Sequence, residues 1–107
     1  MDELERKERY ARLLDIYGSL LGEEQLKRAK DYYFSDYSLA EMAEREGTSR
    51  SAIHLSIRAA ERKLDEYESK LHLSVRISEV ERELDKIEKK SFQRECERIR
   101  RILNNGI

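Results

Sequence analysis

The chain has 107 residues, of which 42% are charged, with a formal net charge of −1, four glycines and no proline. This length fits one domain with a modest core, and the lack of β-branched runs excludes a sheet protein and predicts an all-α fold. No stretch approaches the roughly 18 consecutive apolar residues of a membrane span, residues 1–10 lack a signal-peptide pattern, and the lone Cys96 has no disulfide partner, so we expect a cytoplasmic protein.

Two amphipathic helices are predicted in the first third of the chain. The first covers roughly residues 2–20, because apolar side chains recur there at steps of three and four residues, namely Tyr10, Leu13, Leu14, Tyr17, Leu20 and Leu21. Gly22 follows as a stop or turn residue. Glu23 and Glu24 open the second helix, where carboxylates suit the exposed amides of a first turn. Its expected buried side is Leu26, Ala29 and Tyr33, with Phe34 as a further candidate.

The sequence in the middle of the chain predicts two helices joined by a tight turn. Ser38 and Glu41 have the spacing of a capping box, which satisfies the free amides at a helix start. Gly47 is placed to end this short helix in the left-handed conformation, and Ser49 is a favourable N-cap for a helix that runs to about residue 68. The expected inward side chains are Leu39, Met42 and Ala43 in the first helix and Ala52 or Ile53, Ile57, Ala60 and Leu64 in the second.

The last third of the chain carries a narrow apolar stripe. The coiled-coil spacing is followed first by Leu73, Ile77, Val80, Leu84 and Ile87, and then, after the candidate cap Ser91, by Phe92, Cys96, Ile99 and Leu103. The pattern fits one long helix or two helices with a break near residues 89–91. The stripe packs either on the rest of the domain or on a second copy in a homodimer, and periodicity leaves both open. We therefore divide the chain into a four-helix domain over 1–69, with a helix-turn-helix at 38–64, and a C-terminal helical extension over 70–107.

Residues 38–64 meet the requirements of a helix-turn-helix. Such a motif needs a small residue in its first helix, a glycine at the turn and apolar residues that lock the crossing, and Ala43, Gly47 and Ile53 stand at those positions. The start of the second helix then faces a groove of nucleic acid. Residues 49–63 hold four cations against one carboxylate, a local charge of +3. The candidate nucleic-acid-binding residues are Ser49, Arg50, Ser51, His54, Arg58, Arg62 and Lys63, with Arg50 suited to guanine and Arg58, Arg62 and Lys63 suited to phosphates.

Two resemblances support this motif. The segment "YYFSDYSLAEMAEREGTSRSAIHLSIRAAERKL" resembles the region-four helix-turn-helix of the sigma-70 family. A longer segment, about residues 13–73, resembles the small bacterial YlxM-like proteins, whose sigma-like motif is followed by a "YE-x-KLH" turn and C-terminal helices. That signature here is Tyr67, Glu68, Lys70, Leu71 and His72. The resemblance implies an all-helical fold, often a dimer, and a regulatory role in the signal recognition particle pathway, with the particle's RNA or protein as partner.

A second hypothesis makes the chain a protein-interaction adaptor that uses the helix-turn-helix as a scaffold. Leu55 falls on the outward side of the second helix, where a polar side chain is more usual. It is placed to contact a thymine methyl, a protein partner or the C-terminal helices. A third interpretation treats the arginines as a solvated face, with Arg50, Arg58 and Arg62 paired to Glu46, Glu61 and Glu66.

The sequence gives little support for an enzymatic function. His54 and His72 stand far apart, no Cys or His cluster has metal-ligand spacing, and no glycine-rich phosphate loop is present. We therefore expect no catalytic, cofactor-binding or metal-binding residues. His72, between two leucines, is expected to be partly buried, and Cys96 to be a small core residue. The aromatics expected to pack in the core and its interfaces are Tyr32, Tyr33 and Tyr37.

Overall fold

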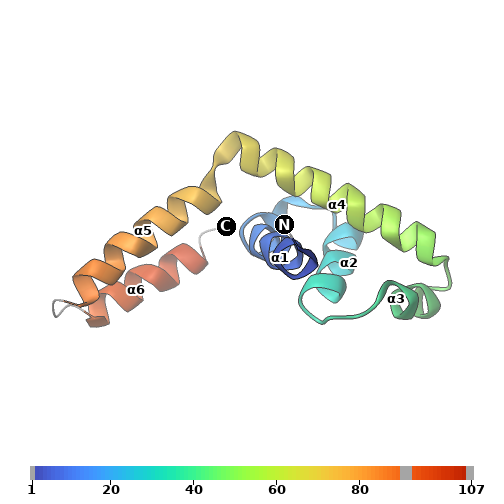
Figure 1. Ribbon diagram of the computed structural model, residues 1–107, viewed down its shortest axis with the longest axis horizontal. Helices are drawn as coiled ribbons and strands as arrows, with labels where there is room; N and C mark the ends of the chain where they lie inside the picture. Colours follow the sequence, from blue (N-terminus) through green and yellow to red (C-terminus); the bar gives the residue numbers. More distant parts are fainter. Residues whose placement is uncertain (1, 90–92, 106–107) are drawn as a thin grey trace.

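The computed structural model describes residues 2–89 and 93–105, and these residues form helices joined by short turns. The elements are α1 (Glu3–Tyr17), the 3-10 turn η1 (Gly18–Leu20), α2 (Glu23–Tyr33), α3 (Leu39–Glu46), α4 (Arg50–Leu71), α5 (Leu73–Glu88) and α6 (Gln93–Asn104). The predicted all-α fold is confirmed. Figure 1 shows α4 lying over α1 and α2, with α3 near the start of α4. From the far end of α4, α5 and α6 extend as an arm, and the molecule is 54 Å long and 28 by 26 Å across.

The main core lies where α1, α2 and α4 meet. It consists of the buried side chains Leu13, Leu14, Ile16, Tyr17, Leu21, Ala29, Ala60 and Leu64. The helix α1 ends at Tyr17, three residues earlier than expected, because the chain tightens into η1. Leu20 is therefore exposed, although it follows the apolar spacing of the first helix. Phe34 is also exposed, because it caps the end of α2 and lies off the buried stripe.

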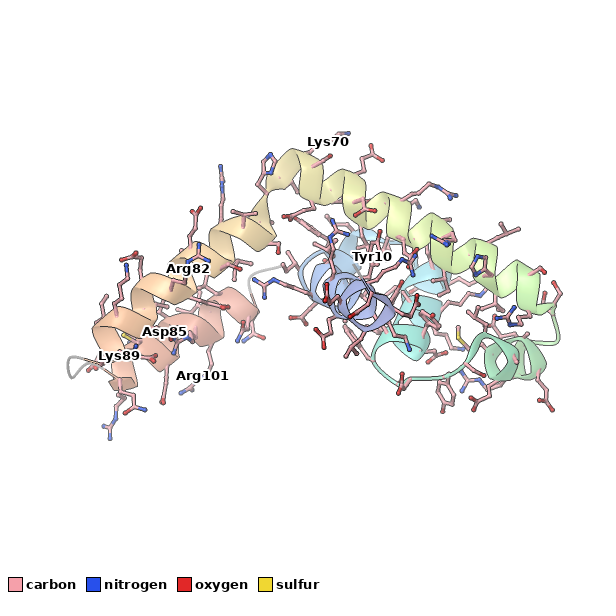
Figure 2. All side chains as sticks on the ribbon, in the orientation of Figure 1. Tyr10, Lys70, Arg82, Asp85, Lys89 and Arg101 are labelled. Carbon is pink, nitrogen blue, oxygen red and sulfur yellow. The ribbon has the colours of Figure 1, made fainter. Side chains whose placement is uncertain are left out.

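A row of hydrogen bonds sets the register between α1 and α4. Asp65 of α4 accepts from the Arg9 guanidinium and from the Tyr10 hydroxyl, each at 2.7 Å. Glu68, almost one turn further along α4, accepts from the Tyr17 hydroxyl at 2.6 Å. Figure 2 shows Tyr10 on α1 beneath α4. These acceptors repeat at helical spacing, so α1 fits α4 in one lengthwise position.

The chain bends sharply at His72, between α4 and α5. His72 adopts the left-handed conformation with φ of 54°, and its amide donates to the Glu68 carbonyl oxygen at 2.9 Å. The turn implied by the family signature is therefore present, and α4 runs three residues beyond the expected end at 68. The His72 side chain is exposed, so the prediction of a partly buried imidazole was wrong. His72 contributes backbone conformation to the junction, and its ring points to solvent.

The arm consists of two helices, α5 and α6, which resolves the alternative that the sequence left open. Leu73 and Ile77 of α5 pack against the main core. Further along the arm, Leu84 and Cys96 are buried where α5 and α6 pack together. Cys96 is only 2% exposed, so its prediction as a small core residue is confirmed. Ser91 and Phe92 lie outside the described residues.

The apolar stripe is only partly covered in one copy of the chain. Its first members contact the main core and its middle is buried inside the arm, whereas Val80, Ile87 and Ile99 remain 40–44% exposed. Packing within the chain thus buries part of the stripe. That the exposed part packs against a second copy in a homodimer stays a prediction. The expected boundary between 1–69 and 70–107 also stays a prediction, and it lies close to the bend at His72.

Candidate nucleic-acid interface

The turn between α3 and α4 is built from local hydrogen bonds. Ser38 and Glu41 form the predicted capping box at the start of α3, with the Ser38 Oγ accepting from the Glu41 amide at 3.0 Å. Gly47 ends α3 at φ of 68°, a conformation that costs residues with a Cβ more than it costs glycine. Ser49 then caps α4, because its Oγ accepts from the Ala52 amide at 3.1 Å. Each of these three roles was predicted from the sequence.

A second cluster of apolar side chains fixes α3 against α4. Its buried members are Met42, Ala43, Ile53 and Ile57, and the partly buried side chains around it are Tyr32, Tyr33, Tyr37 and Leu39. Ile53 is fully buried whereas Ala52 is exposed, which resolves the alternative left by the sequence. The tyrosines pack as expected. This cluster holds the first turns of α4 in a fixed orientation relative to α3.

All candidate binding residues are exposed on α4 or at its N-cap. These are Ser49, Arg50, Ser51, His54, Leu55, Arg58, Arg62 and Lys63. At the start of the helix, Arg50, Ser51, His54 and Leu55 line one shallow hollow. The structure therefore gathers four of the candidates at the end of α4 that a helix-turn-helix presents to its ligand.

The remaining cations lie at different angles around α4. Arg58 points toward α1, with its guanidinium 3.7 Å from the Glu61 carboxylate. Lys63 lines a separate hollow formed by the start of α2 and Ser56. Five residues of α-helix separate the two side chains by roughly 140° around the axis. Arg62 lies between them on the outer face, so Lys63 is not part of the same surface as Arg50 and Arg58.

Most acidic neighbours of α4 are occupied by other partners. Glu46 binds the Arg28 guanidinium at 2.9 Å and Glu66 binds Lys70 at 3.0 Å. Of the pairs in the third interpretation, only the contact of Arg58 with Glu61 is therefore present. Within residues 2–89 and 93–105, Arg50, Arg62 and Lys63 make no ion pair.

The burial of Glu61 and its contacts with α1 and α2 were not predicted from the sequence. Its side chain is buried although it is charged, with 3% of the residue exposed. It accepts hydrogen bonds from the Arg6 guanidinium of α1 and the Tyr33 hydroxyl of α2, and Arg58 lies nearby. Burial, followed by the hydrogen bond to Glu61, raises the pKa of Tyr33. The signal was present in the sequence, because Glu61 falls on the apolar stripe between Ile57 and Leu64.

Two further properties bear on the kind of site. Among the described residues, no group of three or more His, Cys, Asp and Glu side chains is arranged to hold a metal ion. In the same part of the chain, no helix combines the length and the apolar character needed to cross a membrane. The candidate residues exposed on α4 are cations, hydroxyls, one imidazole and one leucine.

Comparison with known proteins identifies the family. A family model described as "Putative helix-turn-helix protein, YlxM / p13 like" matches residues 4–103. A UPF0122 protein of Streptococcus gordonii is 39% identical over 97 residues, which cover 87% of this chain and 88% of that protein. Similar proteins of Malacoplasma penetrans and Streptococcus pneumoniae are 44% and 42% identical over 66 and 71 residues, which cover 62% and 64% of those proteins. The chain belongs to the YlxM/p13-like family of helix-turn-helix proteins.

Proposed function

We propose that this protein binds nucleic acid through α3 and α4 and that binding has a regulatory outcome. One observation carries the proposal. Arg50, Ser51 and His54 lie exposed around one hollow at the start of α4, and Arg50 makes no ion pair among the described residues. Their acidic neighbours are already bound elsewhere, Glu46 by Arg28 and Glu61 by Arg6. A nucleic acid therefore meets an unpaired guanidinium and two further hydrogen-bonding side chains.

The geometry suggests distinct roles for the candidates. Arg50, Ser51 and His54 are assigned to base edges, because they project from the first turns of α4. Arg62 is assigned to phosphate, since it is exposed and free of carboxylates on the outer face. Arg58 is a phosphate contact whose orientation depends on Glu61. Ser49 supports the group as the helix cap, and Lys63 is assigned to phosphate on the other flank of α4.

The family resemblance supports a more specific biological setting. We infer a regulatory role in the signal recognition particle pathway in the cytoplasm, with the particle's RNA as first candidate ligand and its protein component as second. DNA remains a candidate ligand because the motif resembles region four of the sigma-70 family. The half-exposed Val80, Ile87 and Ile99 of the arm support a homodimer.

Fluorescence anisotropy tests the proposal. Labelled random-sequence duplex DNA and signal recognition particle RNA are titrated with the wild type and with Arg50→Ala/Arg62→Ala. We expect the double variant to weaken binding by about tenfold or more, because one good arginine–base contact contributes roughly 1–3 kcal/mol. A control variant, Lys27→Ala/Lys30→Ala, removes the same charge from α2. Equal losses in both variants, or no binding by the wild type at low salt, would refute a binding site on α4.

A second candidate function rests on Leu55. This side chain is 67% exposed and shares the hollow with Arg50, Ser51 and His54. An exposed leucine at the centre of an outer helix face suits a protein partner as well as a base methyl. As an adaptor, the protein would lose binding to the purified signal recognition particle protein with Leu55→Glu and keep it with Arg50→Ala. The opposite pattern would rule out the adaptor.

A further inference from the structure

A row of three arginines lies on the outer face of α6. Arg94, Arg98 and Arg101 stand at positions i, i+4 and i+7, which places them on one face of an α-helix. All three are exposed. At a rise of 1.5 Å per residue the row is about 10 Å long. Figure 2 shows Arg101 on the side of α6 that faces away from α5.

The fourth arginine of α6 has a different environment. Arg100 donates hydrogen bonds to Asp85 and Glu88 of α5, and so it joins the two helices of the arm. In the described part of the chain, the three arginines of the outer row make no ion pair. Asp85 and Glu88, the carboxylates of α5 that approach α6, are thus bound to Arg100. The positive charge of the outer row is therefore available to an external partner.

Charge is distributed unevenly between the two helices of the arm. Residues 93–105 contain four arginines and two glutamates, a net charge of +2. Residues 73–89 of α5 contain four cations and five carboxylates, a net charge of −1. The positive charge of the described arm is therefore concentrated on α6, although the whole chain has a net charge of −1.

We propose that the outer face of α6 is a second nucleic-acid surface, which binds the phosphate backbone of a segment separate from the one on α4. The inference rests on the proposed function. Three arginines and no lysine form the row, and the planar guanidinium matches a phosphate in bidentate fashion. A straight row on a rigid helix suits consecutive phosphates of one strand. Base edges need not be read here, so this surface adds affinity without sequence preference.

The placement of the two helices explains why the segments must be separate. The buried side of α4 rests on α1 and α2, and the buried side of α6 rests on α5. In Figure 1, α4 lies above its supporting helices whereas α6 lies below α5. The outer faces of α4 and α6 therefore point to opposite sides of the molecule. A straight duplex on α4 leaves the row of α6 free, whereas a folded RNA or a second duplex reaches it.

The salt dependence of binding tests the row in the full-length protein. The probes are a short random-sequence DNA duplex and a folded RNA with two helical arms, and the variant is Arg94→Gln/Arg98→Gln/Arg101→Gln. Each lost phosphate contact lowers the slope of log affinity against log salt by about one. With the RNA, we expect the magnitude of this slope to be smaller by about two to three in the variant than in the wild type. The control, Lys27→Gln/Lys30→Gln/Lys86→Gln, removes the same charge elsewhere and should leave the slope unchanged.

Two further comparisons keep the test decisive. Arg94→Lys/Arg98→Lys/Arg101→Lys retains the charge, so it should keep the wild-type slope to within about one. An unchanged slope in the glutamine variant, or an equal loss in the lysine variant, overturns the proposal. If Arg50→Ala/Arg62→Ala loses binding and the glutamine variant does not, the site on α4 stands and the row of α6 fails. If only the glutamine variant loses binding, the row stands and the site on α4 fails.

Bridging of two nucleic acids tests the separation directly. Two short duplexes, one labelled with a donor dye and one with an acceptor, are mixed with the protein. We expect energy transfer with the wild type, and we expect either Arg50→Ala/Arg62→Ala or the glutamine variant of α6 to reduce it. Because a homodimer can also bridge two duplexes through its two α4 sites, it is transfer undiminished in the glutamine variant that would show that α6 holds no second segment.

Discussion

The buried Tyr17 hydroxyl donates a hydrogen bond to Glu68 at 2.6 Å and so joins α1 to the last turns of α4. The same hydroxyl accepts from the Leu73 amide at 3.1 Å, and Glu68 accepts from the Ser74 amide at 3.1 Å. The first amides of a helix lack partners within that helix. Here a tyrosine and a carboxylate supply those partners for α5. The direction of the arm relative to the helix-turn-helix is thereby set by Tyr17 and Glu68.

Replacing Tyr17 by phenylalanine should loosen this junction. The change removes both hydrogen bonds of the hydroxyl and leaves the Leu73 amide without its partner, which costs about 1–3 kcal/mol of unfolding free energy. Urea denaturation measures the loss. Tyr67→Phe is the matched control, because the Tyr67 hydroxyl donates only to the Leu20 carbonyl oxygen at an exposed position. Equal stability losses in the two variants would contradict the claim that the Tyr17 hydroxyl stabilises the junction between α4 and α5.

The helices of this protein were largely predictable because their signals are local. The capping box at Ser38, the left-handed Gly47 and the cap at Ser49 each depend on neighbours a few residues away, and all three were confirmed. The apolar stripe of α4 follows from periodicity. The resemblance to known proteins also implied the turn that the structure shows at His72.

The errors at Glu61 and Glu46 concern contacts between residues distant in sequence. Glu61 binds Arg6 and Tyr33, which precede it by 55 and 28 positions, and helical periodicity carries no information about such partners. The same limit explains why Arg28, and not Arg50, pairs with Glu46. For the candidate site, the sequence predicted exposed cations on α4. Helical geometry alone places Lys63 on a different flank from Arg58, although the two were grouped together as phosphate contacts.

Glu61 should make a large contribution to stability. Glu61→Ala leaves the Tyr33 hydroxyl without its acceptor and leaves the Arg6 guanidinium, whose side chain is 26% exposed, with Glu3 at 3.9 Å. Leaving such a group without its partner costs about 1–3 kcal/mol. Chemical denaturation should show a loss in this range. Glu66→Ala is the control, since Glu66 forms an exposed pair with Lys70 that contributes less than about 1 kcal/mol. A loss below about 1 kcal/mol for Glu61→Ala would show that the network is dispensable.

Tyr33 should make stability depend on alkaline pH. Burial and the hydrogen bond to Glu61 raise its pKa in the folded protein above the ordinary value of 10.0. Folding therefore favours the neutral phenol, so its contribution is complete below pH 10 and declines as the pH rises further. Denaturation at several pH values between 8 and 11 should give a steeper decline for the wild type than for Tyr33→Phe. Parallel curves would contradict this assignment.

The turn between α3 and α4 should require glycine at position 47. Gly47→Ala forces a residue with a Cβ into φ of 68° and should lower the unfolding free energy by about 1–2 kcal/mol. No atom lies within 4 Å of the added Cβ, so the loss reports backbone strain alone. Gly22 is the matched control, because it has the same open surroundings and φ of −65°. Gly22 is the N-cap of α2, so in Gly22→Ala a poorer cap opposes the lower entropy of the unfolded chain, and the net change should stay below about 1 kcal/mol. A loss as large as that of Gly47→Ala would contradict the role assigned to φ.

The central claim is that the exposed arginines of α4 contact nucleic acid. The most direct measurement is the salt dependence of binding to signal recognition particle RNA, compared between the wild type and Arg50→Ala/Arg62→Ala. Loss of the Arg62 phosphate contact should lower the slope of log affinity against log salt by about one, and loss of the Arg50 base contact should weaken binding further, with helix content unchanged by circular dichroism. A double variant that binds with wild-type affinity and wild-type slope would contradict the claim and leave α4 without a role in binding nucleic acid.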